Sequence, residues 1–219
     1  MALAIDAVSS TSGNGAGPFS WSHTCSGSDR VLFVGISHYD SSDTVSGVTY
    51  NSVAMTAVPS GATNNGQFYV SLWYLIAPAT GSNTVSVSMT GSVFDIGMAA
   101  ISFTGSHQTT PYGTAVTATG SSTTPSVVAS SASDEIVLDT LTIVHSGTLS
   151  VGADQTSRWN TNTTNAFIKM AGSTEPGVAS TTMSWSNSTS QDWAIVAVPV
   201  KPTATGVTLR QLCLTGVGT

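Results

Sequence analysis

The amino-acid sequence predicts an all-β protein, a two-sheet antiparallel β-sandwich of jelly-roll-like form. Apolar residues alternate with small polar residues over short runs, which is the period-two pattern of half-buried strands. Clusters of Gly, Asn and Ser separate these runs at the short intervals that are typical of sandwiches and barrels. No stretch has the 3.6-residue periodicity of a helix.

Turn clusters bound the strands expected in the N-terminal half. Arg30–Ser37 is largely apolar and predicts a buried strand, and Asn51-Ser52 predicts the turn of a short hairpin. Residues 9–17 are rich in Ser and Gly and predict a flexible loop. The other strands expected in this half are Val48–Tyr50, Val53–Val58, Phe68–Ile76, Asn83–Met89, Asp95–Thr104 and Thr114–Thr119.

The C-terminal half repeats this style of short strands and polar turns. Asp134–Val144 predicts a long buried strand, and Asp192–Val200 predicts a closing strand. The other strands expected here are Ser126–Ala129, Gln155–Trp159, Ala166–Met170 and Thr181–Trp185.

We expect residues 1–201 to form the sandwich domain and residues 202–219 to stand outside it, because Pro202 and Gly206 interrupt the strand pattern. Within this tail one further strand is expected. It either adds to an edge of the chain's own sheet or reaches a neighbouring molecule as an assembly arm. The apolar residues that would carry this contact are Val207, Leu209, Leu212 and Leu214.

The composition excludes two classes of partner. The chain has 219 residues and a net charge of −6, and its five basic residues are scattered singly, which argues against nucleic-acid binding. No apolar run approaches the length of a membrane span, and residues 1–6 lack the features of a secretory signal. Only 7% of residues are charged, so the surface consists largely of hydroxyls and amides and tolerates close packing in an assembly.

No catalytic signature is present, and no cofactor is expected. The four histidines have neither a zinc spacing nor a neighbouring Gly-x-Ser-x-Gly motif, and His38 and His145 close strands, where we expect hydrogen-bonded surface residues. Asp40 and Asp43 form the best acidic pair and are the candidate ligands for a hard cation such as calcium. The alternative is an Asx-type turn, in which each carboxylate accepts nearby backbone N–H groups.

The tryptophans offer one candidate glycan-binding residue. Trp73 and Trp193 occupy strongly apolar strands and are expected in the core, whereas Trp159 lies among amides and hydroxyls and is the candidate for stacking on a sugar ring. The two cysteines, Cys25 and Cys213, are far apart in the sequence, and we expect two free thiols in preference to a disulfide.

Several fold motifs occur along the chain: Arg-Val-Leu-Phe-Val-Gly-Ile-Ser at 30–37, Val-Thr-Tyr-Asn-Ser-Val-Ala-Met-Thr at 48–56, Ser-Leu-Trp-Tyr-Leu at 71–75, Ala-Ile-Ser-Phe-Thr-Gly at 100–105 and Gln-Thr-Thr-Pro at 108–111. Ala-Ile-Asp-Ala-Val-Ser-Ser at 4–10 and Asp-Trp-Ala-Ile-Val-Ala-Val at 192–198 fit the same pattern. Through these motifs most of the chain resembles a β-sandwich module of tailed-phage virion proteins, of the capsid decoration or cement type, which also occurs in bacterial surface proteins. The resemblance includes no catalytic residue.

The resemblance implies a non-enzymatic structural protein on the capsid surface of a bacteriophage virion, which stabilises or coats the shell. Its expected partners are the major capsid protein or another virion protein, and copies of itself, with a trimer favoured. The alternative is a glycan-binding or adhesive module that recognises a host glycan through Trp159. A third hypothesis is a hydrolase of cell-wall sugars. Such an enzyme requires a buried carboxylate pair with a shifted pKa in a cleft.

Overall fold

The computed structural model describes residues 1–40, 42–145 and 147–204 of the chain. Within these ranges the regular secondary structure consists of strands and includes no helix, and all strand pairs are antiparallel, so the expected all-β sandwich class is confirmed. No helix in this part of the chain could therefore span a membrane. The strands of the described residues gather into four sheets.

The N-terminal module contains two of these sheets. The N-inner sheet has the strand order β1-β9-β3-β7-β6, and the N-outer sheet has the order β2-β8-β4-β5. The strands are β1 (Ala4–Gly15), β2 (Phe19–Cys25), β3 (Val31–His38), β4 (Val45–Tyr50), β5 (Val53–Ala54), β6 (Thr56–Asn64), β7 (Tyr69–Ile76), β8 (Gly81–Met89) and β9 (Val93–Thr104).

The C-terminal module contains the other two. The C-inner sheet has the strand order β10-β17-β12-β15-β14, and the C-outer sheet has the order β11-β16-β13. The strands are β10 (Val116–Ser122), β11 (Ser126–Ala129), β12 (Ile136–Val144), β13 (Leu149–Val151), β14 (Thr156–Asn162), β15 (Ile168–Pro176), β16 (Thr181–Asn187) and β17 (Gln191–Val200).

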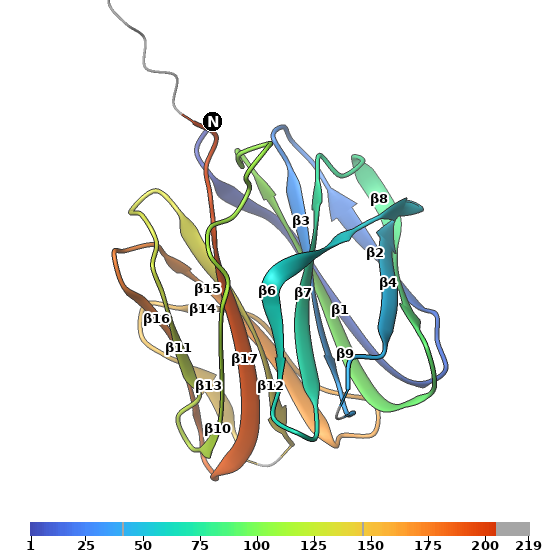
Figure 1. The fold of residues 1–219 in the computed structure, drawn as a ribbon. Helices are drawn as coiled ribbons and strands as arrows, with labels where there is room; N and C mark the ends of the chain where they lie inside the picture. Colours follow the sequence, from blue (N-terminus) through green and yellow to red (C-terminus); the bar gives the residue numbers. More distant parts are fainter. Residues whose placement is uncertain (41, 146, 205–219) are drawn as a thin grey trace, which may run out of the picture.

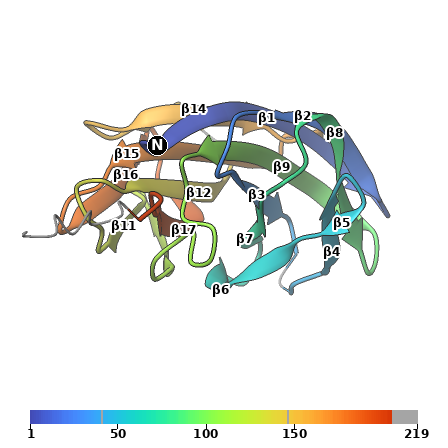
Figure 2. The ribbon, with the colours of Figure 1, turned by 90° about the horizontal axis from the view of Figure 1, so that it is seen from above.

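The four sheets stack as layers in the order N-outer, N-inner, C-inner, C-outer (Figures 1 and 2). Three apolar cores separate them. Alternate residues of β3 show the arrangement, because Val34 and Ile36 pack toward the N-outer sheet while Val31 and Phe33 pack toward the C-inner sheet. The central strands of the inner sheets, such as β3, β9, β12 and β17, are therefore buried on both faces, which explains why their sequences are largely apolar.

The two modules have the same strand order. Strands β1-β9-β3-β7-β6 correspond to β10-β17-β12-β15-β14, and β2-β8-β4 correspond to β11-β16-β13. The registers agree as well, since Val31 pairs with Phe103 and Ile76, and Ile136 pairs with Val200 and Pro176. Residues can therefore be matched between modules by their place in the ladders.

The modules meet through equivalent faces in a reciprocal way. Strand β6 lies against β10 and β17, and its counterpart β14 lies against β1 and β9. Strand β3 lies against its own counterpart, β12. This is the pattern of a two-fold symmetric interface, here formed within one chain. The apolar residues of this interface include Phe33, Phe68, Phe103, Leu138, Met170 and Val196.

Some elements differ from the sequence-based expectation. Residues 9–15 are not a loop, because β1 continues through them and pairs with β9 as far as Gly15. An edge strand is held by backbone hydrogen bonds, which Ser and Gly side chains do not prevent. The expected strand Val53–Val58 is divided, with β5 pairing with β4 and β6 pairing with β7. Strands β2 and β13 were not identified from the sequence.

Candidate functional site

The outward face of the N-outer sheet is an array of hydroxyl groups. Ser22 of β2 lies opposite Thr84 of β8, and Ser86 of β8 is flanked by Ser20 on one side and Thr49 on the other. These side chains are exposed or half-buried, while the alternate residues of the same strands face the core. No Asp, Glu, Lys or Arg occurs in β2, β4, β5 or β8.

The C-outer sheet presents the same kind of face at matching positions. Ser126 lies opposite Ser184, as Ser22 lies opposite Thr84, and Ser150 lies opposite Ser186, as Thr49 lies opposite Ser86. Strands β11, β13 and β16 also contain no acidic or basic residue. The outer sheets form the first and last layers (Figure 2), so their two similar hydroxyl faces point in opposite directions.

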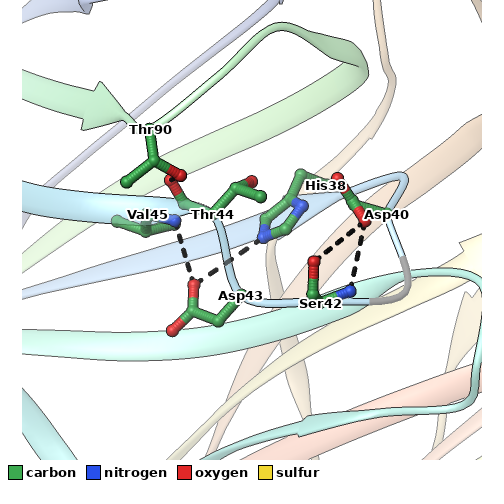
Figure 3. A network of polar contacts seen from close by, with 7 residues as sticks. All are labelled: His38, Asp40, Ser42, Asp43, Thr44, Val45 and Thr90. Atoms are coloured by element: carbon green, nitrogen blue, oxygen red, sulfur yellow. Dashed lines mark hydrogen bonds and ion pairs between the residues drawn. The ribbon is translucent and has the colours of Figure 1, made fainter.

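The loop that follows β3 contains the candidate metal ligands Asp40 and Asp43 (Figure 3). Asp40 Oδ1 accepts hydrogen bonds from the backbone N–H and the hydroxyl of Ser42, both at 3.2 Å, and Asp43 Oδ1 accepts one from the Val45 N–H at 3.0 Å. Each carboxylate thus serves its own Asx turn, the alternative expected for this pair. In the described ranges no three His, Cys, Asp or Glu side chains gather where they could hold a metal ion.

His38 lies beneath this loop and is fully buried, so the expectation of a surface histidine is wrong. Its ring stacks on Tyr69, its cross-strand neighbour on β7, with 5.5 Å between ring centroids. Its Nε2 is 4.0 Å from Asp43 Oδ1, which is beyond hydrogen-bond distance. Burial lowers the pKa of His38, although Asp43 and Asp40 act in the opposite direction, so the neutral ring is the stable form at neutral pH.

Three aromatic rings meet beside this loop. Tyr39 packs edge-to-face on Phe167 with 4.4 Å between centroids, and Phe94 packs on Phe167 at 5.7 Å and on Tyr39 at 6.0 Å. Tyr39 and Phe94 belong to the N-terminal module and Phe167 to the C-terminal module. We call these three residues the aromatic cluster. Phe94 is 55% exposed and Phe167 is 41% exposed, which is unusual for a contiguous group of apolar side chains.

Asp95 holds all three rings in place. Its backbone carbonyl accepts a hydrogen bond from the Tyr39 N–H at 2.9 Å. Its buried carboxylate accepts bonds from the backbone N–H groups of Phe167 at 3.0 Å and Asn165 at 3.1 Å, and the Thr163 hydroxyl also donates to it. The residue next to Phe94 therefore fixes the loop of the other module that carries Phe167.

Trp159 cannot stack on a sugar, because only 4% of its surface is exposed. A β-bulge between Ser157 and Trp159 shifts the side-chain alternation of β14 and turns the indole into the core between the modules. The ring lies over Gly172, where a Cβ atom would come within 2.1 Å of the indole. The expected exposed position is thus wrong, and the bulge is its cause. Trp193 is buried as expected, and Trp73 packs partly buried against the N-terminal core.

A partly buried chain of polar side chains joins β1, β2 and β9. The sequence does not predict it, because its members are far apart in the sequence. The Trp21 N–H donates to Ser9 Oγ at 2.9 Å, so we assign the Ser9 hydroxyl as the donor to His23 Nδ1 at 2.8 Å. On the other side Ser102 donates to Asp6 at 2.9 Å and accepts from His23 Nε2 at 3.1 Å. Burial lowers the pKa of His23 to about 4, against the attraction of Asp6.

In the C-terminal module one carboxyl group is fully buried. Asp139 of β12 accepts hydrogen bonds from the Ser173 N–H at 2.5 Å, the Ser173 hydroxyl at 2.9 Å and Trp185 Nε1 at 2.7 Å. Burial raises the pKa of Asp139 to about 7, although these three donors lower it.

In the N-terminal module Cys25 is a free, buried thiol.

The remaining candidates, Val207, Leu209, Leu212 and Leu214 of the assembly arm, lie outside the described residues, as does Cys213. Thr203, which precedes this segment, donates a hydrogen bond to the Met1 carbonyl at 3.1 Å, so both ends of the described chain lie together.

Comparison of the chain with protein-family models, curated proteins and solved structures found no match.

Proposed function

We propose that this chain is a non-enzymatic structural protein of a bacteriophage virion, which decorates or cements the capsid shell. The observation that supports this role best is the pair of hydroxyl faces on the two outer sheets. A protein that works between other subunits needs contact surfaces, and this molecule has two that are alike and point away from each other.

The chemistry of these faces suits contact with other proteins. A hydroxyl group both donates and accepts a hydrogen bond, so a Ser- or Thr-lined face can pair with many polar surfaces without a fixed pattern of charges. Removing hydroxyls from water costs less than removing charged groups, because ions lose far more solvation energy. Each face belongs to an antiparallel sheet, and antiparallel sheets can pack face to face on other sheets.

The joined modules supply rigidity to such a spacer. The interface between the inner sheets is a continuous apolar core, so the two outer faces are held at a fixed separation. The hydrogen bond between Thr203 and the Met1 carbonyl places both ends of the described chain at one end of the slab, away from both outer faces (Figure 1). The proposed partners are a capsid subunit or another virion protein, and further copies of the chain.

Binding to particles tests this proposal. Particles of a phage that carries the coding sequence, prepared without the protein, are mixed with the purified full-length chain and sedimented. We expect saturable binding, and we expect Ser86→Lys and Ser186→Lys to weaken it at least tenfold, because each places a charge in the middle of an outer face. Ser133→Lys, on an exposed turn of the C-terminal module, is the matched control and should bind normally.

Two outcomes would overturn the proposal. The first is that the wild-type chain does not sediment with the particles. The second is that both lysine variants on the outer faces bind as well as the wild type, although they fold normally as judged by circular dichroism.

A further inference from the structure

An open depression lies beside the aromatic cluster and is lined by six residues of the N-terminal module. It has a volume of about 430 Å³, and its lining combines two aromatic rings with a carboxylate, an amide and a hydroxyl. Binding sites for small molecules commonly have this mixture of apolar surface and a few polar groups. The lining residues are Tyr39, Asp40, Gly66, Gln67, Ser92 and Phe94.

The apolar side of the depression is fixed before any ligand arrives. The three rings of the aromatic cluster brace one another edge-to-face, and Asp95 anchors the backbone on which Tyr39 and Phe167 lie. Asn165, whose side-chain amide donates to the Phe94 carbonyl, adds a further tie between the modules. A site that is ordered in advance loses less entropy on binding.

The polar side presents groups that pair with hydroxyls. Gln67 and Ser92 are exposed, and Asp40 is half-buried with its Oδ1 engaged by Ser42. A carboxylate accepts hydrogen bonds, while an amide and a hydroxyl each donate and accept, so the three groups can satisfy a ligand that has several hydroxyls. Exposed rings on one side and these groups on the other fit a molecule with one apolar face and a hydroxylated edge.

We propose that this depression binds a neutral pyranose unit of a glycan. A pyranose ring has C–H groups on its face, which pack on aromatic rings, and hydroxyls around its edge, which pair with Asp40, Gln67 and Ser92. The ligand is neutral and not acidic because the carboxylates of Asp40 and Asp43 lie in the same loop and the chain carries a net charge of −6. This site is separate from the outer faces, and its existence does not depend on the structural role proposed above.

Titration of the full-length chain with defined oligosaccharides tests the proposal. The neutral probes are maltotetraose, cellotetraose, chitotetraose and mannotetraose, and the acidic probes are sialyllactose and tri-galacturonate. Saturation-transfer NMR detects contact, and calorimetry gives the affinity. We expect at least one neutral probe to bind with a dissociation constant of about 1 mM or tighter, and both acidic probes to bind at least tenfold more weakly.

Variants locate the binding. Phe94→Ala and Gln67→Ala should each weaken the binding of the neutral probe at least tenfold. Phe94→Leu, which keeps an apolar side chain without the ring, should weaken it similarly and guards against local unfolding. Val53→Ala removes an apolar side chain that is 53% exposed on β5, and it should leave the affinity unchanged.

The proposal is overturned if no neutral probe binds, if the acidic probes bind more tightly than the neutral ones, or if Phe94→Leu and Gln67→Ala both bind like the wild type. Loss of affinity in Val53→Ala equal to that in Phe94→Ala would also overturn it, because the binding would then not be located at the aromatic cluster.

Discussion

Gly35 of β3 and Thr140 of β12 occupy the same position in the two modules and face each other across the interface between them. Gly35 pairs with Ala99 and Leu72, and Thr140 occupies the matching place beside Val196. A Cβ atom on Gly35 would lie 2.9 Å from Thr140 Oγ1 and 3.2 Å from Met170 Cε. Contact between two equivalent residues indicates that the approximate two-fold axis passes close to them.

The close approach at Gly35 predicts that any side chain there separates the modules. Gly35→Ala should lower the free energy of unfolding by about 1–3 kcal/mol, because the added methyl group overpacks a well-filled core. Gly47→Ala is the control, since nothing lies within 4 Å of a Cβ atom at that position of β4. Urea denaturation of the two variants and the wild type measures the difference.

A double variant distinguishes overpacking from an intrinsic effect of the substitution. Gly35→Ala combined with Thr140→Gly removes the Thr140 atoms that the new methyl group meets and leaves only Met170 Cε close to it, so the double variant should recover part of the lost stability. A double variant whose destabilisation equals or exceeds the sum of the two single effects would contradict the contact.

Asp95 is expected to be more important for stability than its counterpart in the other module. The next residue, Ile96, pairs with His38 and Gly13, just as Trp193, which follows Asp192, pairs with Ile143 and Gly120. The two aspartates therefore occupy matching places, yet only Asp95 is fully buried. Asp95→Asn leaves at least one of the backbone N–H groups of the 163–168 loop without an acceptor and should cost about 2–3 kcal/mol. Asp192→Asn should have an effect within about 0.5 kcal/mol, and thermal unfolding compares them. Equal effects would show that the carboxylate does not anchor the loop.

His23 makes folding stability depend on pH. Its pKa is lowered to about 4 in the folded chain, so between pH 6.5 and pH 4 the unfolded chain takes up a proton that the folded chain does not. This histidine therefore contributes a loss of roughly 3 kcal/mol as the pH falls through that range. His23→Gln should lack this contribution, and His145→Gln should retain it. Identical pH profiles for His23→Gln and the wild type would refute the assignment.

Asp139 makes folding stability change with pH in the opposite direction. Its pKa is raised to about 7, so as the pH rises from about 4 to 7 the unfolded carboxyl group ionises while the folded one stays protonated. The wild type should lose roughly 4 kcal/mol of stability over this range because of this group. The stability of Asp139→Asn relative to the wild type should therefore increase with pH. Asp134→Asn, on an exposed turn, is the control, and a pH-independent difference for Asp139→Asn would contradict the prediction.

The sequence predicts strands that are buried on one or both faces well, and it predicts the edge strand at residues 9–15 poorly. Continuous apolar runs such as Asp134–Val144 identify the inner strands, and alternation in Asn83–Met89 identifies an outer strand, because burial on both faces or on one face decides the pattern. The run at residues 9–15 carries no such signal, since the backbone alone holds this edge strand. The matched strand order of the modules escapes detection because their pairing geometry is alike while their side chains differ.

The sequence predicts less of the candidate site than of the fold. The Asx turns at Asp40 and Asp43 are local, so the sequence predicts them as one of two alternatives for this pair. The aromatic cluster joins residues from two modules, and only the fold brings Tyr39 and Phe94 to Phe167. Trp159 was misplaced because a single bulge reverses which side of the strand faces the core.

The most direct test of the proposed function is quantitative mass spectrometry of purified virions from a phage that carries the coding sequence. A protein that decorates or cements the shell should be present in a number of copies comparable with that of the major capsid subunit, and it should remain after washing at high salt, because its contact faces carry no charges. Absence of the chain from purified virions, while it is abundant in the infected cell, would contradict the structural role.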